Sequence, residues 1–340
     1  MTAQTPQPPA RPDSAPATQT ATTPPASNRI YLDIAVDHSG QAVAGLRRQD
    51  FTLLDNKQPQ TITSFAAVNG REAPVQVIVV IDGVNAPYQN VEFQRQQLDQ
   101  YLRGESGNLS YPTAIVVLAD DGPHAVTNNF TSDGNALSTA LDHNQLGFRA
   151  ITRSSGYYGA TERFQICLKA MHGLVGSLAQ HTGRKIIIWI SPGWPLLSGP
   201  EVQLDAKQEQ QIFGNIVSLA NEMARTQITL YSIDPLGAGN ATANDWAYGQ
   251  FLKGVTKPSQ AAYGDLGLPV LVTQSGGIAF SSTNGVADHL RQCLTDAVPY
   301  YEISFDPSAS VQKSEYHQLQ VRVAGDGLKA RTRQGYYSQP

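Results

Sequence analysis

Residues that could carry acid–base or nucleophilic chemistry occur in the sequence, but their spacing matches no catalytic pattern. The seven histidines form no HExxH motif and have no neighbouring cluster of cysteines or glutamates, which a zinc enzyme requires. Ser191 ends an apolar run, yet Ser191-Pro192-Gly193 departs from the GxSxG pattern of a nucleophile elbow. Asp120 and Asp121 are adjacent carboxylates, and the Gly122 that follows them indicates a turn. We therefore expect a protein that is not an enzyme.

Cofactor and nucleic-acid binding also lack a sequence signature. The chain has no GxxxxGK loop for nucleotide phosphates, and Leu236-Gly237-Ala238-Gly239-Asn240 lacks the third glycine of a dinucleotide fingerprint. A net charge of −4 gives no basic surface for nucleic acid. The longest apolar runs, Val75–Ile81 and Ile186–Ile190, fall well short of the roughly 20 residues that span a bilayer. We expect no cofactor, no nucleic-acid partner and no membrane span in this chain.

The elements that would position a site follow from hydrophobic periodicity. Val75–Asp82 is nearly continuous aliphatic sequence, which is typical of a parallel strand buried on both faces. Further strands are predicted at Ala114–Leu118, Lys185–Ser191, Ile228–Ile233 and Gly277–Ser281, with a short antiparallel edge strand near Ala125–Phe130. Helices are predicted at 91–102, 135–141, 161–180, 206–226 and 286–297. This alternation predicts an α/β domain over residues 71–299, with a mostly parallel sheet and helices on both faces.

The two ends of the chain have a different character. Residues 1–28 are rich in Pro and Thr with few large apolar residues, which predicts a disordered tether. Ile30, Leu32, Ile34 and Val36 alternate with polar residues, as in a half-buried strand. The same period of two returns after residue 300. Each β segment (29–70 and 300–340) has too few strands to stand alone, so we expect the two to pack together as a small β-sandwich-like domain.

The order of these elements is similar to that of a von Willebrand factor type A (VWA) domain. More narrowly, the chain resembles the VWFA-related proteins of the acidobacterial type. The likeness covers about residues 29–337 and implies a VWA/Rossmann-like fold. It rests on the motifs Gly45-Leu46, Asp50-Phe51, Gly183-Arg184-Lys185, Trp189-Ile190-Ser191, Tyr231-Ser232-Ile233-Asp234-Pro235, Ser275-Gly276-Gly277, Tyr300-Tyr301 and Arg333-Gln334-Gly335-Tyr336-Tyr337.

The resemblance also implies a degenerate metal site. VWA domains commonly bind a divalent cation through an Asp-x-Ser-x-Ser segment, a later Thr and a later Asp. Here the first segment is Asp82-Gly83-Val84-Asn85-Ala86, with aliphatic residues at both serine positions, and Pro192 stands at the position of the later Asp. Thr161 matches the Thr, and Asn85 and Asp234 are possible substitute oxygen ligands. We expect at most weak Mg²⁺ or Ca²⁺ binding, with Asp82 and Thr161 capping a turn and a helix instead.

Large aromatic residues occur in the loops predicted at the carboxyl ends of the strands, where open α/β sheets bind their ligands. The partner-binding candidates are Tyr88, Tyr157, Tyr158, Trp194 and Trp246. Trp194 is the strongest single candidate because Pro192 and Pro195 stiffen its loop. We expect a non-enzymatic protein-interaction or scaffolding module with an unknown protein partner. The alternatives are a metal-dependent adhesion module and, least favoured, an enzyme of an unrecognised type.

The amino-acid composition indicates the cellular compartment in which the protein functions. Charged residues make up only 15% of the chain, and uncharged polar residues take their place, as in many envelope and secreted proteins. The polar start after Met1 is typical of an exported protein whose signal peptide has been removed, so we expect a periplasmic, cell-envelope or secreted protein; a cytoplasmic protein with a disordered N-terminus is the alternative. Cys167 and Cys293 lie in helical patterns, which favours two buried thiols over a single bridge.

Overall fold

The computed structural model describes residues 29–69, 75–86, 88–127, 129–143, 156–197, 202–235, 247–281, 285–295, 297–307 and 313–339. The predicted tether at residues 1–28 lies outside these ranges. No helix within them combines the length and the apolar character that crossing a membrane requires.

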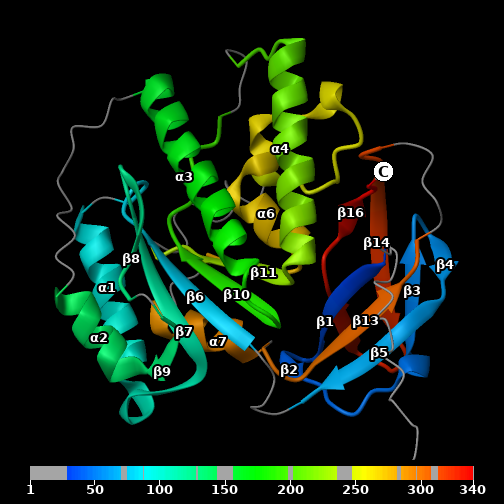
Figure 1. Cartoon of the computed structure of the whole chain (residues 1–340), viewed down its shortest axis with the longest axis horizontal. Helices are drawn as coiled ribbons and strands as arrows, with labels where there is room; N and C mark the ends of the chain where they lie inside the picture. The colour runs from blue at the N-terminus through cyan, green and yellow to red at the C-terminus, as the bar shows by residue number, and fades with distance from the viewer. Residues whose placement is uncertain are drawn as a thin grey trace, which may run out of the picture.

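A seven-stranded sheet forms the centre of the molecule, in the order β12-β11-β10-β6-β7-β8, with β9 also paired to β7 (Figure 1). Its parallel members are β6 (Val75–Asp82), β7 (Asn108–Ala119), β10 (Arg184–Ile190), β11 (Ile228–Ile233) and β12 (Ala279–Phe280). The antiparallel members are β8 (Gly122–Ala125) and β9 (Thr131–Asp133). The prediction of a mostly parallel sheet is confirmed.

The antiparallel edge strand was predicted a few residues too late. Instead of lying near Ala125–Phe130, β8 begins at Gly122, which pairs with Ala119 across the turn. The reason is that Asp120 and Asp121 form the whole turn between the two strands, so the chain reverses without a longer loop.

Helices cover both faces of this sheet because successive strand residues point to opposite sides. One apolar core joins Ile78, Val80 and Trp189 to three helices, α3 (Gly156–Leu178), α4 (Ala206–Arg225) and α6 (Leu268–Gln274). The other core joins Val79, Ile81 and the opposite strand faces to α1 (Tyr88–Leu102), α2 (Gly134–His143) and α7 (Val286–Thr295). Cys167 belongs to the first core and Cys293 to the second; both are buried, and neither forms a disulfide.

Strands from the two ends of the chain pair directly with each other. In one sheet, β1 (Ile30–His38) is antiparallel to β13 (Tyr300–Phe305), which pairs in turn with β5 (Ile62–Val68). The short β2 (Gln41–Ala42) and β15 (Leu328–Arg331) also pair with β1. The second sheet has the order β16-β14-β3-β4, formed by Gly335–Tyr337, Tyr316–Val323, Phe51–Asp55 and Gln58–Gln60.

These two terminal sheets share one apolar core. Leu32 and Ile303 from the first sheet lie in it with Leu53, Leu319 and Tyr336 from the second. Short 3₁₀ helices complete the connections: η1 (Arg48–Asp50), η2 (Gly104–Gly107), η3 (Pro258–Gln260) and η4 (Tyr263–Leu266).

A partly buried group of charged and polar side chains lies where the central sheet meets the terminal strands. The guanidinium of Arg184, at the start of β10, lies 4.7 Å from the ring centre of Tyr300 on β13. The side-chain nitrogen of Gln227 donates to Asp33 at 3.3 Å and to Glu302 at 3.5 Å. Burial raises the pKa of Asp33, while Arg184 acts to lower it. The two parts of the molecule are therefore joined by polar contacts as well as apolar ones.

Candidate functional site

Asp82 ends β6, and its side chain is fully buried at the edge where the parallel strands end. Its Oδ1 accepts hydrogen bonds from the backbone N–H groups of Val84 and Asn85, at 2.9 Å each. Its Oδ2 accepts from Nδ2 of Asn85 at 2.8 Å. It also accepts from Oγ of Ser191 at 2.7 Å and from Nε1 of Trp189 at 3.3 Å. Five donors surround this carboxylate, so it uses its acceptor capacity within the protein.

The neighbours of Asp82 do not fit a divalent cation. Val84 is 0% exposed and lies in the core beneath α3, while Ala86 is 3% exposed and lies in the core beneath α1. Neither side chain has an oxygen to offer, and hard cations require oxygen ligands. The described residues contain no group of three or more His, Cys, Asp or Glu side chains that could hold a metal ion.

The other predicted metal ligands have separate roles. Asn85 donates through Nδ2 to Sγ of Cys167 at 3.1 Å as well as to Asp82. Thr161 donates to the backbone oxygen of Tyr157 at 2.9 Å, one turn back along α3. Asp234 follows β11, and its backbone N–H donates to the carbonyl of Phe280 at 2.8 Å.

Thr161 does not cap α3, contrary to our expectation from sequence. The helix begins at Gly156, five residues before the predicted start, so Thr161 lies in its second turn. The sequence did not predict this start, because residues 156–159 are Gly-Tyr-Tyr-Gly and glycine has a low intrinsic helix propensity.

Trp194 is a core residue, which corrects its assignment as the leading recognition residue. It is 3% exposed, and its ring centre lies 5.3 Å from that of Trp189 and 6.3 Å from that of Phe164. Its Nε1 has no hydrogen-bond partner among the described residues. The physical reason is its packing between β10 and α3, and the residue before it, Gly193, has a φ of 109°, which glycine adopts readily. Trp194 therefore offers no ring to a partner.

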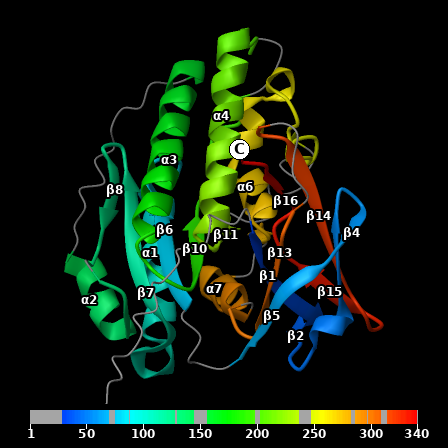
Figure 2. The same cartoon turned by 45° about the vertical axis from the view of Figure 1, so that its right-hand side comes forward.

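Tyr157 and Tyr158 are accessible. They are 49% and 84% exposed, and their rings meet edge to face with centres 6.2 Å apart. Helices that connect parallel strands run antiparallel to them, so the first turn of α3 lies on the side of the sheet where the strands end. Figures 1 and 2 show α3 and α4 side by side, both extending beyond that edge. The side chain of Tyr88 and all of Trp246 lie outside the described residues.

A series of aromatic side chains connects this exposed pair with the buried end of β10. Tyr263 on η4 is half-buried, and its ring centre lies 5.6 Å from that of Phe164 on α3. Burial raises the pKa of Tyr263, and the nearby Tyr157 raises it further. Phe164 in turn contacts Trp194, which packs on Trp189. We refer to Tyr263, Phe164, Trp194 and Trp189 as the aromatic series.

Sequence reasoning missed two members of this series. Phe164 has an apolar position in α3, which predicts burial but not its aromatic neighbours. Tyr263 lies in a short 3₁₀ helix to which no periodicity points. The N-terminus of the adjacent α4 is fixed by Asp205, whose carboxylate accepts from the backbone N–H of Gln208 at 2.8 Å.

The strand order and register define the chain as an α/β protein with a Rossmann-like parallel core, joined to antiparallel terminal sheets. No protein-family model matches the chain, and neither does any curated protein sequence. Among solved structures, it is similar to the N-terminal domain of TFIIH p34, with a TM-score of 0.31 and 12% identity over 65% of this chain and 98% of that one. Manganese-loaded Plasmodium vivax TRAP protein gives a TM-score of 0.36 and 10% identity over 82% of this chain and 99% of that one. Likenesses at this level carry no information about function.

Proposed function

We propose that this chain is a non-enzymatic protein-interaction or scaffolding module of the VWFA-related type, which contacts its partner through the exposed end of α3. The observation that carries the proposal is the pair Tyr157 and Tyr158, the more exposed of which has 84% of its surface in solvent. An exposed aromatic pair gains burial energy on binding, and tyrosine is enriched among the residues that dominate interfaces.

The rest of α3 makes this pair a preorganised surface. The helix buries Phe164, Cys167, Leu168 and Met171 against the central sheet. Because the following turns are held by the core, its first turn loses little freedom when a partner binds. The partner that fits is a protein with an apolar pocket for one or both tyrosine rings.

The proposed location is the cell envelope, the periplasm or the medium, in keeping with the low charged content of the chain. Metal-dependent adhesion is the less favoured function. It requires oxygen ligands where this chain has Val84 and Ala86, and the Asp82 carboxylate already accepts five hydrogen bonds.

Quantitative affinity capture from a native envelope fraction tests the proposal. Three baits are compared: the unmodified chain, the double variant Tyr157→Ala/Tyr158→Ala, and Tyr31→Ala. Tyr31 is a matched control because it is a 51% exposed tyrosine on β1, in the terminal sheets. We expect a captured protein whose recovery falls at least about tenfold with the double variant, since a true anchor contributes about 2 kcal/mol.

The control bait should retain that protein fully, and a binding titration with the purified partner should give the same ranking. Equal recovery by all three baits would place the contact surface elsewhere on the molecule.

A further inference from the structure

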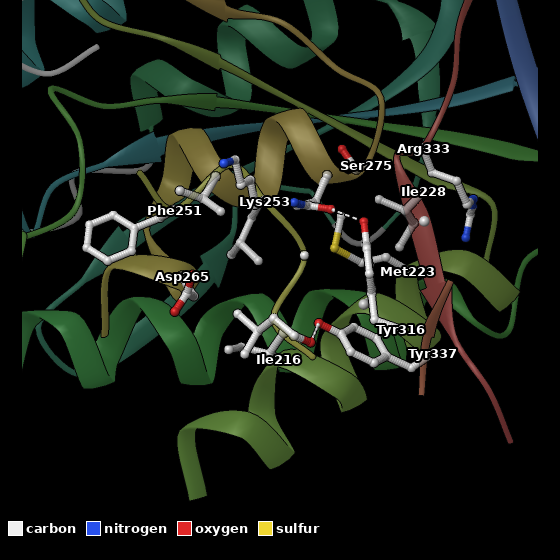
Figure 3. A pocket seen from close by; sticks show the side chains of 17 residues that line it. Ile216, Met223, Ile228, Phe251, Lys253, Asp265, Ser275, Tyr316, Arg333 and Tyr337 are labelled. Carbon is white, nitrogen blue, oxygen red and sulfur yellow. Dashed lines mark hydrogen bonds between the residues drawn. The ribbon is translucent and has the colours of Figure 1, made fainter. Parts of the chain in front are cut away.

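A small cavity lies between the helices α4 and α6 of the central part and the terminal strands β14 and β16 (Figure 3). Its walls come from α4, α6, the segment 251–255 and the terminal strands β14 and β16. Ile216, Met223 and Leu271 make one side apolar, and the rings of Tyr316 and Tyr337 form another. The volume of about 50 Å³ suits a slim chain rather than a drug-sized ligand, which needs about 300 Å³ or more.

The rings of the two tyrosines are fixed because their hydroxyl groups bond to other groups in the cavity wall. The hydroxyl of Tyr337 donates to the backbone oxygen of Val255 at 3.0 Å. That of Tyr316 donates to Oε1 of Gln274 at 3.5 Å. The ring centres lie 5.2 Å apart. Residue 254 must be glycine for this arrangement, because a Cβ there would lie 2.0 Å from the ring of Tyr316.

Asp265 places a carboxylate in this apolar wall. Its side chain is 7% exposed, and Oδ2 accepts a hydrogen bond from the backbone N–H of Ala262 at 2.7 Å. No hydrogen bond or ion pair reaches Oδ1 from the residues that the structure describes. Burial raises the pKa of Asp265 to about 6, and no cation among the described residues offsets that effect. A buried carboxylate is costly without a counter-ion, so the end of the cavity beside Asp265 favours a cation.

Two cationic residues, Arg333 and Lys253, also line the cavity, but neither pairs with Asp265. The guanidinium of Arg333 donates to the backbone oxygen of Ala224 at 3.3 Å and interacts with Asp33. Figure 3 shows Arg333 at the opposite end of the cavity from Asp265, with Tyr316 between them. Lys253 is solvent-exposed and makes no ion pair with Asp265.

We propose that this cavity binds a small linear alkylammonium compound, whose ammonium group pairs with Asp265 and whose alkyl chain packs against Met223, Ile216 and the tyrosine rings. Carboxylate, aromatic faces and an aliphatic wall are together the environment that a primary ammonium on a hydrocarbon chain requires. The site is separate from the end of α3 and does not depend on the proposed protein contact.

Calorimetric titration of the full chain with n-butylammonium chloride, n-butanol and sodium butyrate tests the proposal. The three probes share their length and differ in charge. At about pH 8, where Asp265 is ionised, we expect n-butylammonium to bind at least about tenfold more tightly than either of the others. Its affinity should fall below about pH 6, while that of n-butanol stays constant. Equal affinities for n-butylammonium and n-butanol would overturn the proposal.

The variant Asp265→Asn isolates the charge. Asparagine keeps an oxygen acceptor for the Ala262 N–H and nearly the same volume, so the cavity retains its shape. We expect n-butylammonium to bind at least about tenfold more weakly and n-butanol to bind as before. The matched control is Asp288→Asn, which removes an exposed carboxylate on α7 and should leave all affinities unchanged. An equal loss in both variants would show nonspecific attraction to net charge and would also overturn the proposal.

Discussion

The hydroxyl of Ser191, just after β10, donates to the carboxylate of Asp82 at the end of β6 across 2.7 Å. This bond ties together the carboxyl ends of two neighbouring parallel strands, β6 and β10. The hydroxyl also accepts from the backbone N–H of Gly193 at 3.0 Å, so the loop that carries Trp194 is fixed by the same contact. Asp82 therefore organises the edge of the sheet.

Asp82→Ala should be strongly destabilising, because it leaves several buried donors without an acceptor. We expect the free energy of unfolding to fall by about 3 kcal/mol or more, as measured by chemical denaturation. Asp121→Ala is the control, since its side chain is 74% exposed, and it should change stability by less than about 0.5 kcal/mol. A similar small effect at both positions would contradict the organising role of Asp82.

Trp194→Ala should also destabilise the protein, by about 3–5 kcal/mol, because it removes a buried ring from the aromatic series. Denaturant titration followed by circular dichroism measures this effect without relying on tryptophan fluorescence. Tyr158→Ala, which alters an exposed ring, should leave the unfolding midpoint nearly unchanged. Full stability of Trp194→Ala would mean that its indole is not a core group.

Magnesium, manganese and calcium should bind near Asp82 no more tightly than about millimolar, because the carboxylate is already hydrogen-bonded and hard cations need oxygen ligands. Calorimetric titration of chelator-treated protein measures this directly. A submicromolar dissociation constant, together with Asn85 or Asp234 among the ligands in a metal-soaked crystal, would reverse the prediction.

Asp265 gives the stability a defined pH dependence. Burial raises its pKa from 3.8 to about 6, so the folded chain holds this proton more tightly than the unfolded chain does. The stabilisation that the folded chain gains from holding this proton is fully present below about pH 4 and is lost as the pH rises through about 6. Asp265→Asn removes that loss, and the variant should be more stable at about pH 8 by up to about 3 kcal/mol. Denaturation at several pH values should show this advantage disappearing near pH ~4.

Much of the central sheet could be predicted from sequence because its signals are local. The aliphatic run at 75–81 specifies a strand covered on both faces, whatever its neighbours are. Alternation at Ile30, Leu32, Ile34 and Val36 likewise specifies one buried face for β1, although Ala35 is buried too. Such patterns depend only on the period of the backbone.

The sites could be predicted far less well because they depend on distant residues. Trp194 follows a strand between two prolines, and only the positions of Phe164 and Trp189 make it a core residue. The cavity around Asp265 needs Tyr316 and Tyr337, which come from strands more than fifty residues later. No spacing in the sequence indicates that these distant residues will be in contact in the fold.

The pairing of β5 with β13 has a mechanical consequence. Val68 lies opposite Tyr300, so the chain leaves and returns to the terminal sheets through two adjacent strands. Tension applied between residues 29 and 339 would first act on the ladders of those sheets. Force would reach the helices and the central sheet only after the β5–β13 ladder had opened. Stretching in an optical trap should therefore extend the terminal strands before the central sheet, which is shielded from load until then.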